Sequence, residues 1–102
     1  MKYMLCRNRV RNFSAWKRVF DSHADAHRKA GLKLVHLWQD ADSPSQVFFL
    51  FEVEDITRAR AFVESPDAPS AARESGLIEG EFHFFTQSQG YAAPVPADAA
   101  KT

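Results

Sequence analysis

The stretch QVFFLFEVE, residues 46–54, has the composition of a β-strand and is apolar on both of its sides. Because successive side chains of a strand point to opposite faces, one face carries Val47, Phe49, Phe51 and Val53, and the other carries Phe48 and Leu50. A sheet that helices cover on one side normally has a polar second face. Since neither face is polar here, we predict that helices cover one face and that a copy of the same sheet covers the other, in a homodimer packed sheet to sheet.

The flanking segments complete the order β-α-β-β-α-β. We expect further strands at residues 2–10, 32–40 and 81–87, and a helix from the N-cap Asn12 to about Ala30, ended by Gly31. A second helix follows Asp55 and is interrupted at Ser65-Pro66, and a further turn or two over residues 70–75 ends at Gly76. This order predicts an α+β, ferredoxin-like fold with a four-stranded antiparallel sheet in the order 4-1-3-2 and helices on one face.

Length and composition limit the classes of function. The 102 residues fit a single domain, which we place at residues 1–87, followed by a flexible Ala/Pro-rich tail over 88–102. Thirteen basic and thirteen acidic residues cancel, which disfavours nucleic acid as a partner. The single cysteine, Cys6, excludes an internal disulfide and any CxxC motif. The first ten residues are too short and charged for a signal peptide, and no apolar run could span a bilayer, so we expect a cytoplasmic protein without a membrane partner.

Several short matches extend along residues 2 to 87. They comprise Trp16-Lys17, Phe20-Asp21, His23, Arg28 and Gly31 in the first helix, then Asp42, Pro44, Val47, Asp55, Ala59, Phe62, Ser65, Gly76-Leu77 and Gly80. Together they resemble the dimeric α+β barrel superfamily, above all its small antibiotic-biosynthesis-monooxygenase-like and cyclase-like members. The resemblance implies the same fold and a small, mostly apolar ligand held between helices and sheet. The superfamily includes cofactor-free monooxygenases, polyketide cyclases and haem proteins, so the fold alone leaves the activity open.

The histidines of FDSHADAHRKAG, residues 20–31, stand four apart and therefore lie one helical turn from each other. One reading is a metal site, but the HExxH pattern is absent because Ala24 replaces its glutamate, and at most one of His36 and His83 could join the pair. Haem ligation by one of the two rings is a second reading. A third is that both rings are simply solvated at the helix end, where His27 also interacts favourably with the helix dipole.

The reading that we prefer places both histidines in a pocket. His23 and His27 continue a helical stripe that begins with Phe13, Trp16 and Phe20, so three aromatic rings and two titratable rings face the interior. Imidazole exchanges protons near neutral pH, and an apolar cleft with a few polar groups is typical of a small-ligand site. Trp38 belongs to the same wall if its strand face meets the helices, which the sequence does not decide.

RNA-recognition domains share this topology and carry stacking aromatics on the third strand. Their motif needs a basic residue and a glycine before the aromatics, and Ser45-Gln46-Val47 supplies neither. We therefore predict a small-ligand protein, either a cofactor-independent monooxygenase- or cyclase-like enzyme acting on an aromatic or polyketide-like compound, or a non-catalytic dimeric binding or scaffold protein. His23 is the predicted acid–base group, Trp16, Phe20, His27 and Trp38 shape the pocket, and no metal or cofactor is expected.

Overall fold

The computed structural model describes residues 1–87 as one sheet and four helices. The strands are β1 (Lys2–Val10), β2 (Leu32–Gln39), β3 (Gln46–Val53) and β4 (Leu77–Phe85), and the helices are α1 (Phe13–Ser22), α2 (Ala24–Lys29), α3 (Ile56–Val63) and α4 (Ala68–Ser75). The predicted tail, residues 88–102, lies outside the described residues. No helix in the described part of the chain is long and apolar enough to cross a membrane.

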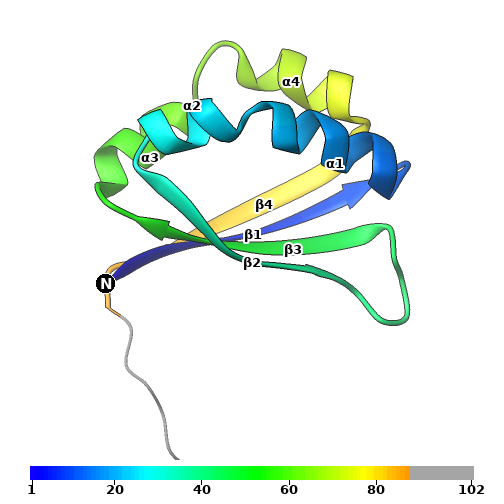
Figure 1. Cartoon of the computed structure of the whole chain (residues 1–102), viewed down its shortest axis with the longest axis horizontal. Coiled ribbons are helices and arrows are strands. Elements are labelled where there is room, and N and C mark those ends of the chain that lie inside the picture. Colours follow the sequence, from blue (N-terminus) through cyan, green and yellow to red (C-terminus); the bar gives the residue numbers. More distant parts are fainter. Residues whose placement is uncertain (88–102) are drawn as a thin grey trace, which may run out of the picture.

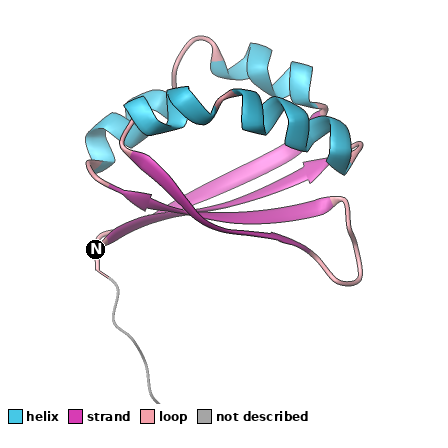
Figure 2. Ribbon diagram, in the orientation of Figure 1, coloured by secondary structure: helices cyan, strands magenta, loops and turns pink. Residues whose placement is uncertain are grey.

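The sheet has the strand order β2-β3-β1-β4, and every neighbouring pair is antiparallel. Figures 1 and 2 show all four helices on one face of this sheet, with α1 and α2 in front of α3 and α4. The predicted α+β, ferredoxin-like topology and its strand order are therefore confirmed.

The core lies between the sheet and the helices. On β3 the side chains of Val47, Phe49, Phe51 and Val53 are all at most 6 % exposed and point toward the helices. Trp16 of α1 and Ala59 of α3 are the most deeply buried helical residues in this core. The two-residue period of residues 46–54 and the helical period of α1 thus meet in one apolar layer.

Capping residues begin the helices, and glycines end them, at the positions that the sequence predicts. The Asn12 side chain accepts a hydrogen bond from the Ala15 amide (2.8 Å), and that of Asp55 accepts one from the Arg58 amide (3.1 Å). Gly31 and Gly76 have φ angles of +77° and +74°, a region that a Cβ atom disfavours. The predicted N-caps and C-terminal glycines are confirmed.

The first helix is not continuous, which corrects the prediction of one helix reaching Ala30. The Ser22 hydroxyl donates to the Val19 carbonyl (2.6 Å), and the His23 amide donates to Phe20, three residues back (3.1 Å). The His23 bond replaces the regular four-residue backbone spacing, and the Ser22 hydroxyl adds a side-chain bond to a helix carbonyl; bonds of both kinds bend helices. His23 therefore lies at the junction between α1 and α2.

The last helix and strand both begin earlier than predicted, at Ala68 rather than residue 70 and at Leu77 rather than residue 81. Asp67, at the N-cap position before Ala68, makes no side-chain capping bond, so the start carries a weak local signal. Gly80 breaks the alternating pattern of β4, but pairing with Asn8 and Arg9 of β1 extends the strand back to Leu77.

The sheet face away from the helices, the open face, carries a diagonal apolar band. The band consists of Trp38, Phe48, Leu50, Leu5, Tyr3 and Phe85. Residues that are paired in an antiparallel sheet share a face, and the pairs Trp38–Phe48, Leu5–Leu50 and Tyr3–Phe85 connect all four strands. Trp38 and Phe85 are 45 % and 43 % exposed. No described element covers the band.

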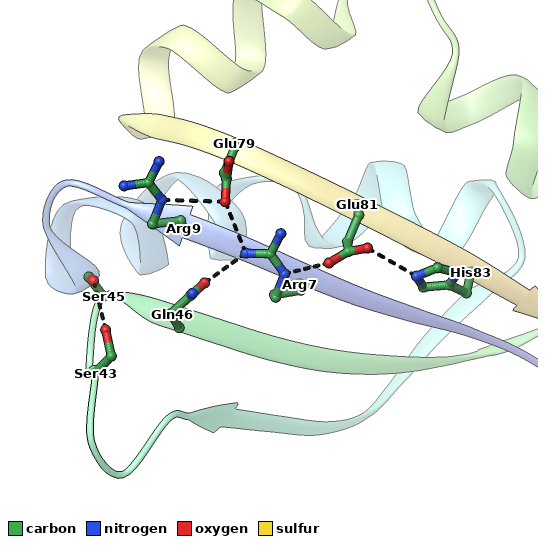
Figure 3. Close-up of polar contacts among 8 residues, drawn as sticks. All are labelled: Arg7, Arg9, Ser43, Ser45, Gln46, Glu79, Glu81 and His83. Carbon is green, nitrogen blue, oxygen red and sulfur yellow. Dashed lines mark hydrogen bonds and ion pairs between the residues drawn. The ribbon is translucent and has the colours of Figure 1, made fainter.

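A polar cluster occupies one corner of the open face, beside the apolar band (Figure 3). Arg7 binds Glu81 (2.5 Å), Gln46 (2.8 Å) and Glu79 (3.3 Å), and Glu79 also pairs with Arg9 (3.4 Å). The hydrogen bond from Arg7, aided by one from His83, lowers the pKa of the Glu81 carboxyl. Arg7, Arg9, Glu79 and Glu81 of this cluster are therefore held in mutual ion pairs.

Candidate functional site

A cleft of about 810 Å³ lies between the helices and the sheet. Residues from all four helices and from β1, β3 and β4 line it, together with Leu32 of β2. Six aromatic side chains form much of its wall: Trp16, Phe20, Phe49, Phe51, Phe62 and Phe82. A concave, largely aromatic cavity of this size fits a small organic ligand.

Small side chains on α4 leave room for this cleft. Ala68, Ala71, Ala72 and Ser75 of α4 line the cleft. The Ser75 hydroxyl is satisfied within its own helix, where it donates to the Ala72 carbonyl (2.9 Å). The α4 wall therefore contributes space and apolar surface, with little polar recognition.

Trp16 is the fixed centre of the aromatic wall. It is 2 % exposed and stacks on Phe20 with ring centroids 4.8 Å apart, and Phe49 packs against it at 5.5 Å. In the amide orientation that satisfies both neighbours, Asn8 accepts a hydrogen bond from Trp16 Nε1 (3.2 Å) and donates to the Arg7 carbonyl (3.0 Å). The indole donor is thus already used by the protein.

Asn8 lines the cleft and is not among the site residues predicted from the sequence. The sequence contains a sign of this role, because Asn8 is a polar residue on the face of β1 that also carries Met4 and Cys6. Gly80 faces it across the β1–β4 pair, and a Cβ atom on Gly80 would lie 2.7 Å from the Asn8 amide. The glycine leaves the space in which Asn8 reaches Trp16.

His27 lines the cleft within a group of phenylalanine rings. Its ring centroid lies 4.9 Å from Phe20, 5.1 Å from Phe51 and 5.6 Å from Phe62. The pKa of His27 is lowered from 6.5 to about 4, chiefly because burial disfavours the charged ring and also because His23 repels it. His27 is therefore a neutral imidazole at pH 7.

His23 also lines the cleft, at the junction of α1 and α2. Its ring is half-buried and stands 6.5 Å from that of His27, at an interplanar angle of 80°. In the described residues, no carboxylate bonds to either ring. The two imidazoles are thus brought together with Trp16 and Phe20, as the helical stripe predicts.

Trp38 is not part of this cleft, and its predicted place in the pocket wall therefore needs correction. The register shifts between Leu34 and His36, so Leu37 pairs with Phe49 on the helix side while Trp38 pairs with Phe48 on the open face. Trp38 instead stacks on His36, with centroids 4.9 Å apart and planes 19° apart. The structure separates it from the histidine pair by the full thickness of the sheet.

Two further features of the surface and side chains do not form a comparable site. A hollow of about 840 Å³ at the corner of Lys2, Arg28 and Lys33 has no aromatic lining and is bordered by Glu52 and Glu54. Within residues 1–87, no three His, Cys, Asp or Glu side chains gather closely enough to hold a metal ion. The aromatic cleft therefore remains the strongest candidate.

We expect the stability of the protein to fall between pH 6.5 and pH 4 in a way that depends on His27. Between these pH values the His27 ring is protonated in the unfolded chain and neutral in the folded chain. The free energy of unfolding therefore decreases as pH falls and levels off below pH 4. The full pKa shift corresponds to a loss of about 3 kcal/mol in the free energy of unfolding. Because the ring is only partly buried, we expect a loss of about 1–2 kcal/mol.

Urea denaturation at pH 7 and pH 4.5 measures this effect. The matched variant His27→Phe keeps an aromatic ring among Phe20, Phe51 and Phe62 but removes the titrating group. It should lose less stability than the wild type on acidification. Equal losses in the two proteins would show that His27 does not titrate in this way.

No protein-family model and no curated protein sequence matches the chain, whereas solved structures do match it. A candidate antibiotic biosynthesis monooxygenase from Bordetella bronchiseptica superposes with a TM-score of 0.69 at 13 % identity, covering 86 % of this chain and 97 % of that one. A variant of SnoaB, a cofactor-independent oxygenase from Streptomyces nogalater, gives 0.67 at 18 % identity, covering 87 % and 94 %. An uncharacterised NIPSNAP domain protein from Burkholderia xenovorans gives 0.61 at 11 % identity, covering 91 % and 100 %.

These matches span nearly the whole length of each neighbour. Because the sequence identities are low, they show a shared fold and nothing about activity. The fold includes the four-stranded sheet, the helical layer and the order in which they are connected. The resemblance noted in the sequence is therefore confirmed at this level: the chain has the ferredoxin-like α+β fold of the antibiotic-biosynthesis-monooxygenase-like proteins.

Proposed function

We propose that the protein binds a small aromatic or polyketide-like compound in the cleft and acts on it as a cofactor-independent monooxygenase- or cyclase-like enzyme. The observation that carries the proposal is the cleft itself, in which six aromatic rings and two imidazoles surround about 810 Å³. The likeness to SnoaB supports the reaction class by analogy of fold.

His23 is the acid–base group in this proposal. Without a cofactor, the substrate itself must supply electrons to molecular oxygen, and an electron-rich ring does so after losing a proton from carbon. His23 lies at the cleft edge and takes that proton. In the complete reaction a ring CH₂ loses both hydrogens, one oxygen atom of O₂ becomes a carbonyl oxygen, and the other leaves as water. Phe20 and Trp16 hold the ring plane of the substrate.

A second candidate is a binding protein without turnover, and one observation favours it. Proton-transferring histidines are commonly oriented by a third group, and in the described residues neither His23 nor His27 has such a partner. The pKa of about 4 also makes His27 a weak base. The same cleft would then hold its ligand for transport, storage or assembly.

Binding and turnover of an anthrone separate these candidates. We expect anthrone to raise the melting temperature of the wild type, and the cleft-filling variant Ala72→Phe to lose at least tenfold in affinity, because Phe occupies the space that α4 leaves. Ala61→Phe, an equal change on the exposed side of α3, is the control and should bind normally.

Oxygen consumption with the same compound then tests the chemistry. Turnover that falls at least tenfold in His23→Ala while binding persists supports the enzyme, and binding without oxygen uptake supports the second candidate. If no aromatic compound binds, or if Ala72→Phe binds as well as the wild type, the cleft is not the site.

We also propose that the protein is a homodimer formed by its open faces. The apolar band crosses all four strands, two of its large aromatic residues are more than 40 % exposed, and no described element covers it. The polar cluster beside it contains both signs of charge, so two copies could meet there without a net repulsion. Two sheets pack face to face in this way when their inner side chains interdigitate.

A further inference from the structure

We infer that His27 sets the specificity of the cleft, by selecting uncharged aromatic ligands that carry a hydroxyl group over ligands of the same shape without one. This inference rests on the proposed binding function of the cleft and adds the residue that recognises the polar group of the ligand. It concerns recognition and assigns no proton transfer to His27.

The first argument is that His27 has unused hydrogen-bonding capacity at the cleft. In the described residues its ring makes no hydrogen bond, yet no unpartnered side-chain nitrogen or oxygen is fully buried. Its ring nitrogens are therefore accessible, and His27 lines the cleft. The three phenylalanine rings around the imidazole offer it no hydrogen-bond partner, so a polar group of a ligand can take the place of water at the ring.

The second argument is the protonation state. Burial keeps His27 neutral at pH 7, and a neutral imidazole has one N–H donor and one acceptor nitrogen. A hydroxyl group can serve either nitrogen, since it both donates and accepts. A methyl group in the same position makes no hydrogen bond with either nitrogen. It also displaces water, so the ring nitrogen is left without a hydrogen-bond partner.

The third argument is that three other polar side chains of the wall, those of Trp16, Asn8 and Ser75, are already engaged within the protein, although His23 and Ser65 also line the cleft. Trp16 Nε1 donates to Asn8, and the Asn8 amide donates in turn to the Arg7 carbonyl. Ser75 donates to Ala72 within α4. Neither the indole nor these side chains offer a free donor comparable to the ring of His27.

The charge of the lining argues against anionic ligands. No described residue that lines the cleft is Lys or Arg, whereas two of the lining residues, Asp67 and Glu81, are acidic. Glu81 is neutralised by Arg7 on the open face, and Asp67 makes no capping bond. An aromatic carboxylate would therefore enter a cleft without a counter-ion.

Three naphthalene probes of equal ring size test the inference: 1-naphthol, 1-methylnaphthalene and 1-naphthoate, each titrated at pH 7 by naphthyl fluorescence. In the wild type we expect 1-naphthol to bind about two- to tenfold more tightly than 1-methylnaphthalene, the range that one neutral hydrogen bond provides. The carboxylate should bind least well. In His27→Phe the preference for 1-naphthol should disappear, while 1-methylnaphthalene binds at least as well as before.

Two controls keep the result interpretable. His36→Phe makes the same change on the open face and should leave the preference intact, and His27→Gln, which restores a hydrogen-bonding group, should recover part of it. Equal binding of the hydroxyl and methyl probes by the wild type, or a preference that survives in His27→Phe, would overturn the role of His27 while the cleft stands. Tight binding of 1-naphthoate would overturn the charge selection. If none of the three probes binds, the proposed binding function fails, and this inference fails with it.

Discussion

Leu50→Glu is expected to convert the proposed dimer into a monomer at micromolar concentration. Leu50 lies at the centre of the apolar band, paired with Leu5 on one side and with His36 on the other. In a two-fold interface each substitution occurs twice, so the variant would bury two carboxylates against apolar side chains. The cost of burying an unpaired charge is several kcal/mol, which corresponds to an increase in the dissociation constant of at least about 100-fold.

Light scattering after size-exclusion chromatography measures this effect. The wild type should elute with about twice the chain mass of 11.5 kDa, and Leu50→Glu with the single-chain mass. Leu50 is only half-buried in one chain, so the folded protomer tolerates the change, which far-UV circular dichroism checks. Ala61→Glu adds the same charge to an exposed position of α3 and should remain dimeric. A wild type that is monomeric, or a Leu50→Glu protein that is dimeric, would exclude the interface.

Trp16→Ala is expected to lower the free energy of unfolding by about 3–5 kcal/mol, the usual range for removing a buried tryptophan. Trp16 is 2 % exposed and contacts Phe13, Phe20 and Phe49, so its loss opens a void in the core beside the cleft. The change also removes the hydrogen-bond donor that Asn8 accepts. A free-energy loss of this size is a large fraction of the stability of a small domain.

Trp38→Ala is the matched comparison, because it makes the same substitution on the open face, where the indole is 45 % exposed. Compared in the Leu50→Glu background, so that association does not contribute, it should lower the stability by about 1 kcal/mol or less. Urea denaturation followed by far-UV circular dichroism measures both variants. Equal losses for the two tryptophans would contradict the assignment of Trp16 to the core and Trp38 to the open face.

The sequence predicts the features that neighbouring residues control. Asn12 and Asp55 cap helices through bonds to amides three residues ahead, and Gly31 and Gly76 end helices because their φ angles are positive. The alternation of residues 46–54 predicts the two faces of β3, and the helical stripe predicts that Trp16, Phe20, His23 and His27 share one cleft. These relations depend on the two-residue period of a strand and the 3.6-residue period of a helix, and both can be recognised from the order of residues alone.

Other features depend on contacts between segments that are far apart in the sequence, and only the tertiary structure decided them. Strict alternation from Leu32 would place Trp38 on the helix side, but the irregularity between Leu34 and His36 reverses the faces, because the pairing with β3 shifts there by one residue. The low pKa of His27 comes chiefly from burial, and Phe51 of β3 and Phe62 of α3, which folding brings against the ring, contribute to that burial. Local periods determine which residues share a side of an element, whereas pairing and burial between elements determine what that side meets.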